Sequence, residues 1–296
     1  YIWLAILTQL IASTIPSASK VVLNSFSVEP YIAIRWTFSS IVFGILLFIR
    51  KERCIWKPAL LAKTSILGIL GYGLASLGTL YAVKIGGVSF FGLLTLLSPL
   101  IVVALSTLVL REKIERNTKF AFGIALLGIL LMINGKIAID SVASALTAAT
   151  LVIAAYVCDS LTFLYSKPFR KELPLIQYMF VAQLAAAIAS WIISIYLYSW
   201  RELLPAGAEM WTAIVYVSLV SCCGIFFVWY WLLKYLQGQQ LGILQYLHGI
   251  AAAVLGVLFF NEKVSWTMAL GSLALFLSIV VASTKRRHTE TIAAET

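Results

Sequence analysis

The feature that most constrains this chain is a series of long apolar runs that carry few or no charges. The run from Val88 to Leu110 has no charged residue at all. An α-helix needs about 20 mostly apolar residues to cross a bilayer, and its backbone groups must be satisfied within the helix itself. The strict alternation of a membrane β-strand is absent from these runs. The sequence therefore predicts an all-α integral membrane protein.

We expect ten transmembrane helices. Their approximate ranges are 1–20, 31–49, 64–83, 88–110, 120–135, 141–166, 175–199, 210–233, 239–260 and 264–284. The loops between them are short, so no extramembrane enzyme domain is expected, and residues 285–296 form a polar cytoplasmic tail.

The composition agrees with a membrane environment. Hydrophobic residues make up 61% of the chain and charged residues 11%, whereas soluble domains average about 45–50% and about 25%. A net charge of +10 is typical of some nucleic-acid-binding proteins. Here the charges lie in short gaps between apolar runs, so we expect the lipid bilayer, and no nucleic acid, as a partner.

The distribution of lysine and arginine predicts the orientation. Most of these residues fall on one face if the first helix starts inside the cell, which places both termini in the cytoplasm of a bacterial inner (plasma) membrane. The opposite, outer face would carry Lys20, Arg35, Lys84, Lys136, Arg201 and Lys263. We expect Arg35 and Lys84 to lie near the outer boundary and to extend their charged ends into the headgroup region.

A shift of 150 residues superimposes the two halves of the chain. Lys84 then falls on Lys234, and the pair Glu112-Lys113 falls on Glu262-Lys263. Charges are rare in this chain, so these coincidences predict two repeats, over 1–135 and 141–284. Five helices per repeat is an odd number, so the second copy must be inverted. Inverted repeats are typical of alternating-access transporters.

Two stretches carry a family resemblance. LLTLLSPLIVVALSTLVLREKI followed by GIALLGILLM, and ILQYLHGIAAAVLGVLFFNEKV followed by ALGSLALFLSIVVAS, resemble the EamA domain of the drug/metabolite transporter superfamily. The resemblance implies ten helices and transport of small metabolites. It also implies a structural role for Glu112 and Glu262, as caps of the next helix or partners of a basic residue. Pro99 has Gly249 as its counterpart, which leaves the hinge behaviour of the ninth helix open.

Asp159 is the main candidate for contact with a substrate. An ionisable group inside a span costs a few kcal/mol, so it is a functional hypothesis by default. Tyr156 lies one turn earlier on the same helical face, and a carboxylate beside an aromatic ring can bind a cation. The alternative is a carboxylate near the inner end of the helix that reaches water.

Other polar groups lie within predicted spans. The 150-residue shift maps Gln245 to Thr95 and His248 to Ser98, so two helices related by the repeat present polar pairs at equivalent depth. The predicted substrate-binding set is completed by Tyr246, Gln9 and Ser13. His248 can also carry a proton near neutral pH. The alternative for these groups is hydrogen bonding and close packing between helices.

The sequence therefore predicts a secondary active transporter for a small polar, zwitterionic or cationic metabolite resembling an amino acid, and proton coupling is a further hypothesis. Two alternatives stay open: a larger cationic substrate such as S-adenosylmethionine, or a lipid-linked flippase. An enzyme is not expected, since Asp159 and His248 have no further acid or histidine beside them in a span. No nucleotide-binding or metal-binding motif appears, so we expect no cofactor. The oligomeric state is not predicted.

Overall fold

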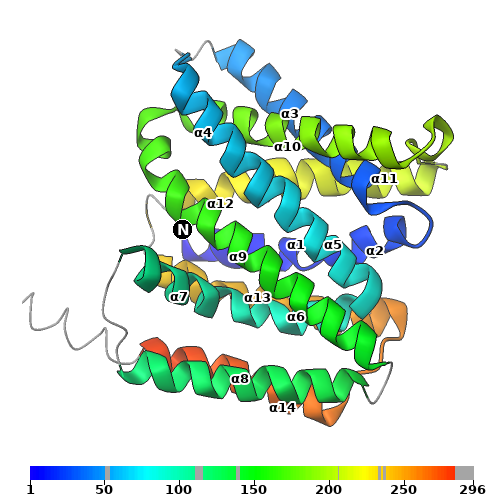
Figure 1. Cartoon of the computed structure of the whole chain (residues 1–296), viewed down its shortest axis with the longest axis vertical. Coiled ribbons are helices and arrows are strands. Elements are labelled where there is room, and N and C mark those ends of the chain that lie inside the picture. The colour runs from blue at the N-terminus through cyan, green and yellow to red at the C-terminus, as the bar shows by residue number, and fades with distance from the viewer. Residues whose placement is uncertain are drawn as a thin grey trace, which may run out of the picture.

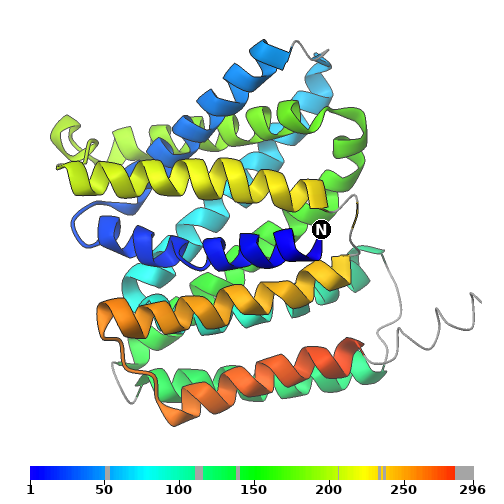
Figure 2. The same ribbon diagram turned by 180° about the vertical axis from the view of Figure 1, so that it is seen from behind.

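A computed structural model describes residues 1–50, 54–110, 116–137, 141–205, 207–232, 235 and 238–283. The predicted tail 285–296 and Glu112 lie outside these residues. The described part of the chain is built from helices that lie side by side in alternating directions (Figure 1), and it contains no β-strand. Figure 2 shows that the start of the first helix and the end of the last lie on the same side of the bundle.

The helices of the first half are α1 (Ile2–Ala12), α2 (Ile15–Leu23), α3 (Val28–Arg50), α4 (Pro58–Gly68), α5 (Ala75–Gly86), α6 (Val88–Leu94), α7 (Ser98–Leu110) and α8 (Arg116–Ile137). Those of the second half are α9 (Val142–Glu172), α10 (Leu175–Leu197), α11 (Ala208–Tyr216), α12 (Phe226–Leu232), α13 (Gly238–Phe260) and α14 (Trp266–Ser283). Four short segments have other helical geometry: the π-helices η1 (Ile69–Leu74) and η4 (Val217–Ile225), and the 3₁₀-helices η2 (Thr95–Leu97) and η3 (Trp200–Glu202).

Within the described residues, seven helices are long and apolar enough to cross a membrane. They span Ile2–Leu23, Val28–Arg50, Pro58–Gly86, Lys119–Lys136, Val142–Ser166, Leu175–Leu197 and Ala208–Trp229. Three shorter apolar helices cover Val88–Val102, Leu247–Phe260 and Trp266–Ser278. The prediction of an all-α membrane protein thus holds. Seven of the ten predicted spanning helices are long enough to cross a membrane. For the other three, membrane spanning stays a prediction.

Three pairs of helices pack side by side across the two halves of the chain. They are α3 with α10, α6 with α13, and α8 with α14. Each pair is antiparallel. In the pair α8–α14, Gly128 lies against Gly271, whereas the later residue Gly135 lies against the earlier residue Ser265. The helices cross closely here: a Cβ added to Gly128 would lie 2.8 Å from the carbonyl oxygen of Gly271.

Each π-helix interrupts a longer continuous helix: η1 lies between α4 and α5, and η4 lies between α11 and α12. Aromatic residues in or next to both π-helices contact α3. Tyr72 of η1 and Phe226, directly after η4, both pack against Trp36 of α3, with ring centroids 5.0 and 6.0 Å away. The rings of Tyr72 and Phe226 also meet each other at 5.4 Å. A π-helical turn widens the helix and is frequent at functional sites. Elements from both halves of the chain therefore converge on one aromatic cluster, formed by Trp36, Tyr72 and Phe226.

The two helices that correspond at Pro99 and Gly249 differ in geometry. The rod that contains Pro99 changes from α6 to 3₁₀ geometry over Thr95–Leu97 and resumes as α7. Pro99 has no N–H, so it cannot complete the α-helical hydrogen bond to the preceding turn. The counterpart helix α13, with Gly249 in place of a proline, is a continuous α-helix.

Candidate functional site

Asp159 lies on the face of α9 that points into the bundle. The residues around it on this face, Ala155 and Thr162, are buried, whereas Ala154 and Tyr165 on the opposite face are exposed. The helical repeat places Asp159 in the middle of the buried face, yet Asp159 itself is exposed. Its accessible surface must therefore open toward the interior of the bundle, since buried neighbours separate it from lipid.

The surroundings of Asp159 connect it to the first π-helix. Thr162, one turn later, donates a hydrogen bond to the carbonyl oxygen of Leu67 at 3.3 Å. Its side chain is so close to η1 that a Cβ on Gly71 would lie 2.6 Å from it. Tyr156, one turn before Asp159, is half-buried and packs against the core. Asp159 thus lies one turn from a residue that contacts η1 and one turn from an aromatic ring.

Arg35 of α3 is buried in the bundle, with 6% of its surface accessible. Its Nη2 donates to the Cys222 sulfur at 3.5 Å, and its guanidinium carbon lies 5.4 Å from the ring centroid of Tyr31 and 5.3 Å from that of Trp36. Among the described residues no carboxylate forms an ion pair with Arg35. Its Nε is buried and has no hydrogen-bond partner.

The prediction that Arg35 extends into the headgroup region is therefore wrong. The predicted span began at residue 31, which placed Arg35 about one helical turn from its outer end. The helix actually begins at Val28, so Arg35 lies about 10 Å along its axis. Aromatic side chains enclose the guanidinium there. The sequence did contain a signal for a role of Arg35 inside the bundle. An ionisable residue within a spanning helix is a functional hypothesis by default.

The predicted polar residues of the first rod point inward. Gln9 and Ser13 of this rod are buried, with 5% and 2% of their surfaces accessible. Ser13 Oγ donates a hydrogen bond to the carbonyl oxygen of Leu10 at 2.7 Å, so its hydroxyl is held by its own helix. Contact of Gln9 and Ser13 with a substrate stays a prediction.

The predicted polar pairs of the fourth and ninth helices are brought together in part. Thr95 and Ser98 are buried, and Thr95 Oγ1 donates to the carbonyl oxygen of Gly92 at 2.7 Å. Thr95 lies directly against Gly249, which leaves room for its hydroxyl. His248, the neighbour of Gly249, is half-buried. The side chains of Gln245 and Tyr246 lie outside the part of the chain that the structure describes.

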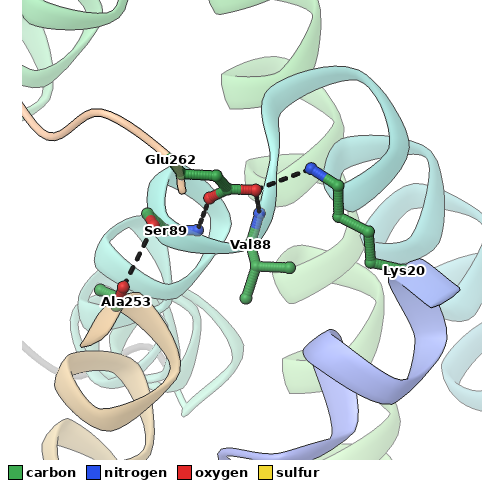
Figure 3. Close-up of polar contacts among 5 residues, drawn as sticks. All are labelled: Lys20, Val88, Ser89, Ala253 and Glu262. Atoms are coloured by element: carbon green, nitrogen blue, oxygen red, sulfur yellow. Dashed lines mark hydrogen bonds and ion pairs between the residues drawn. The ribbon is translucent and has the colours of Figure 1, made fainter. Parts of the chain in front are cut away.

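Glu262 connects three elements at one end of the bundle (Figure 3). Its Oε1 accepts a hydrogen bond from Lys20 Nζ at 2.7 Å, which is also an ion pair. The backbone N–H groups of Val88 and Ser89 donate to its two oxygens at 2.9 and 2.6 Å. The expected capping and pairing are both present, but the capped helix is α6. The next helix, α14, is capped instead by Ser265, whose Oγ accepts from the N–H of Met268 at 3.2 Å.

The pKa of Glu262 follows from these contacts. Partial burial by itself raises the pKa, but the hydrogen bonds from Lys20 and from the N–H groups of Ser89 and Val88 stabilise the charged form and lower the pKa below its ordinary value. Glu262 is therefore ionised at neutral pH. It ties the start of α6 and the end of α2 to the loop between α13 and α14.

A pocket of about 330 Å³ surrounds this tie. Four lysines and one carboxylate contribute to its lining, which makes it strongly positive: Lys20, Lys84, Lys136, Lys263 and Glu262. Phe260 and Met268 supply part of its apolar wall. A concave surface with one dominant sign of charge concentrates ions of the opposite sign, so this end of the bundle attracts anions.

Comparison with known proteins places this arrangement in a family. The model of the EamA-like transporter family matches residues 1–134 and 146–284. The chain belongs to this family. The chain is 25% identical to a Bacillus subtilis (strain 168) protein named "Uncharacterized transporter YetK", over 97% of the chain and 88% of that protein. A solved structure titled "Crystal structure of protein" shares its fold, with a TM-score of 0.66, 19% identity and coverage of 97% and 98% of the two chains.

Membership supports a coarse description of what the EamA-like transporter does. It is an integral membrane protein with a transport role, which implies contact with the bilayer and a small-molecule substrate. The family and the relative are both described as transporters, which is consistent with the expectation that the chain is not an enzyme.

Proposed function

We propose that this protein is a secondary transporter that moves a small zwitterionic metabolite by alternating access, using two inverted five-helix halves over 1–135 and 141–284. The observation that carries the proposal is the antiparallel pairing of α3 with α10, α6 with α13, and α8 with α14. Each pair joins helices at corresponding places in the two halves, as a twofold axis in the membrane plane requires. Inverted repeats bind substrate near the midplane, where the halves meet.

The substrate site in this proposal is built around Asp159. Its carboxylate opens toward the bundle interior and lies near the half-buried ring of Tyr156. A carboxylate and an aromatic ring together attract an ammonium group. Thr95, Ser98, Gln9 and Ser13 supply hydroxyl and amide groups for hydrogen bonds, and Gln245 and Tyr246 complete the proposed set.

Asp159→Asn should therefore strongly reduce accumulation of amine-bearing substrates. Removing the charge while keeping the shape of the side chain should lower uptake at least about tenfold, since a charge-assisted hydrogen bond contributes about 1.5–3 kcal/mol. A thermal-shift screen against amino acids and S-adenosylmethionine, with flux into liposomes for the compounds that bind, measures this effect. Glu209→Gln, at an exposed residue of α11, is the control. Normal uptake by Asp159→Asn would defeat the assignment, and lipid transfer between leaflets without solute flux would favour a flippase.

Proton coupling is proposed through His248, which lies beside Gly249 at the crossing of α6 and α13. His248→Gln keeps hydrogen bonding but removes the titratable group, so the dependence of transport on an imposed pH gradient should disappear. Flux into liposomes with and without a gradient measures the change. A variant that still responds to the gradient as the unmodified protein does would assign His248 to packing.

The proposed orientation places both termini on the cytoplasmic side of a bacterial inner membrane. Most lysines and arginines then face the cytoplasm, and the start of α1 and the end of α14 lie on one side of the bundle (Figure 2). In this orientation the positive pocket around Glu262 opens at the outer face.

A further inference from the structure

We infer that Arg35 binds a carboxylate group of the transported substrate. This inference rests on the proposed function and deepens it, because it names the residue that holds the anionic end of a zwitterion. The argument starts from electrostatics. A buried charge without a counter-ion destabilises a folded protein, and among the described residues no carboxylate pairs with Arg35. A substrate anion would supply the missing negative charge.

The carboxylate nearest in the sequence is already engaged elsewhere. Glu29, on the same helix, accepts hydrogen bonds from the hydroxyl groups of Tyr81, at 2.5 Å, and Tyr198, at 2.8 Å. It is itself buried, with 7% of its surface accessible. Glu29 is therefore held by two tyrosines at the start of α3, and it forms no ion pair with Arg35 in the described part of the chain.

The hydrogen-bond donors at Arg35 are poorly used. Its Nη2 donates to a thiol sulfur, which is a weak acceptor, and the Tyr31 hydroxyl is the other polar group that interacts with the guanidinium. Its Nε has no partner, and neither has Nε1 of the adjacent Trp36, although both atoms are buried. Buried donors are satisfied in the great majority of cases. Two adjacent residues that both retain an unsatisfied donor indicate a site for a hydrogen-bond acceptor. The planar guanidinium of arginine can bind a carboxylate through two parallel hydrogen bonds.

The position of Arg35 suits a substrate site between the two halves. Its sulfur partner Cys222 belongs to the π-helix η4, while Tyr72 of the other π-helix, η1, packs on Trp36. Elements whose helical geometry is irregular are the parts of a rod that can change shape most easily. A ligand bound here would contact segments from both halves, as alternating access requires.

The neighbours of two opposite charges contact the same π-helix, which points to a zwitterion. On one side η1 meets Trp36, the neighbour of Arg35, through Tyr72. On the other side it meets Thr162, one turn from Asp159, through Gly71. A substrate with an ammonium group at Asp159 and a carboxylate at Arg35 neutralises both charges. A substrate with several phosphates would instead be repelled by Asp159.

The test uses the purified full-length protein and three sets of probes. These are the common amino acids, the corresponding amino-acid amides, which lack the carboxylate, and the corresponding carboxylic acids, which lack the amine. Binding is measured by thermal shift for the unmodified protein, Arg35→Met and Arg35→Lys. Arg201→Met, at an exposed residue of η3, is the matched control. Uptake into liposomes is measured separately for each compound that binds.

We expect at least one amino acid to stabilise the unmodified protein and its amide to bind at least about tenfold more weakly. Arg35→Met should weaken amino-acid binding about 10- to 100-fold, because hydrogen bonds to a charged group are lost. The ligand-free melting temperature of Arg35→Met should stay level or rise, since an unpaired buried charge is removed. Arg35→Lys should keep part of the affinity, since it retains the charge without the fork. Arg201→Met should bind as the unmodified protein does.

Three results would overturn the inference: amides that bind as tightly as amino acids, no stabilisation of the unmodified protein by any amino acid, or amino-acid affinity unchanged in Arg35→Met. If Arg35→Met is unstable, the inference is still tested by comparing the binding of amides and amino acids to the unmodified protein and to Arg35→Lys. Arg35-dependent binding without flux would contradict the proposed function alone. Flux that is unaffected by Arg35→Met would contradict this inference alone.

Discussion

Glu262→Gln is expected to destabilise the purified protein by about 2–4 kcal/mol, with a clear fall in its apparent melting temperature. The change leaves Lys20 without its ion-pair partner. It also replaces a carboxylate that accepts from two backbone N–H groups, those of Val88 and Ser89. The amide of glutamine has a single oxygen, so one of these two N–H groups must lose its acceptor. Thermal unfolding in detergent measures the effect.

The pH dependence provides a second measurement on the same residue. The folded-state pKa of Glu262 is lowered, so its contribution to stability is complete above the ordinary carboxylate pKa of 4.5 and is lost as the pH falls through the lowered folded-state value. The unmodified protein should therefore lose melting temperature below about pH 4.5, and the loss should be smaller in Glu262→Gln.

Glu172→Gln is the matched control for Glu262→Gln. Glu172 pairs with Lys57 at 3.8 Å, and the two side chains are 54% and 70% exposed, so this pair should contribute about 0–1 kcal/mol. If Glu262→Gln behaved like Glu172→Gln, the tie between α2, α6 and the α13–α14 loop would have no role in stability.

Gly68→Ala is expected to destabilise the protein by at least about 3 kcal/mol, enough to reduce its accumulation in the membrane. A Cβ at this position would lie 2.1 Å from the backbone oxygen of Ala182 on α10. Backbone atoms cannot rotate away as a side chain can, so α4 and α10 would have to separate. Expression level and melting temperature of the purified variant measure this effect.

Gly123→Ala tests whether the effect is specific to close packing. Gly123 lies within α8, and a Cβ there would meet nothing within 4 Å. The same substitution should be neutral or stabilising by up to about 1 kcal/mol, because alanine favours the helix. Equal stability of Gly68→Ala and Gly123→Ala would show that α4 and α10 do not pack this closely.

Several elements were predictable because they depend on local chemistry. Apolar runs of about 20 residues predict helices in lipid regardless of what surrounds them. Asp159 stood out because a carboxylate in an apolar run needs an explanation. The charged pair Glu262-Lys263 stood out because it repeats Glu112-Lys113. Glu262 has the expected basic partner, Lys20, but it caps α6 and not the helix that follows it.

Other features could not be predicted from local sequence patterns. The prediction for Arg35 failed because it depended on the start of α3, and a shift of three residues moved the guanidinium from the boundary into the bundle. The π-helices η1 and η4 were also not predicted. Their wider turns allow Tyr72 and Phe226 to meet on Trp36, and this contact joins segments that are distant in the sequence.

The sequence by itself determined that this chain is helical and lies in a membrane, since both follow from the hydropathy of single segments. It also pointed to the family and to Asp159. Only the tertiary structure decided that Glu262 caps α6 and that Arg35 is enclosed with no carboxylate partner among the residues that the structure describes. The physical reason is that hydropathy acts on each segment separately, whereas the partner of a buried charge depends on which helices meet and at what depth.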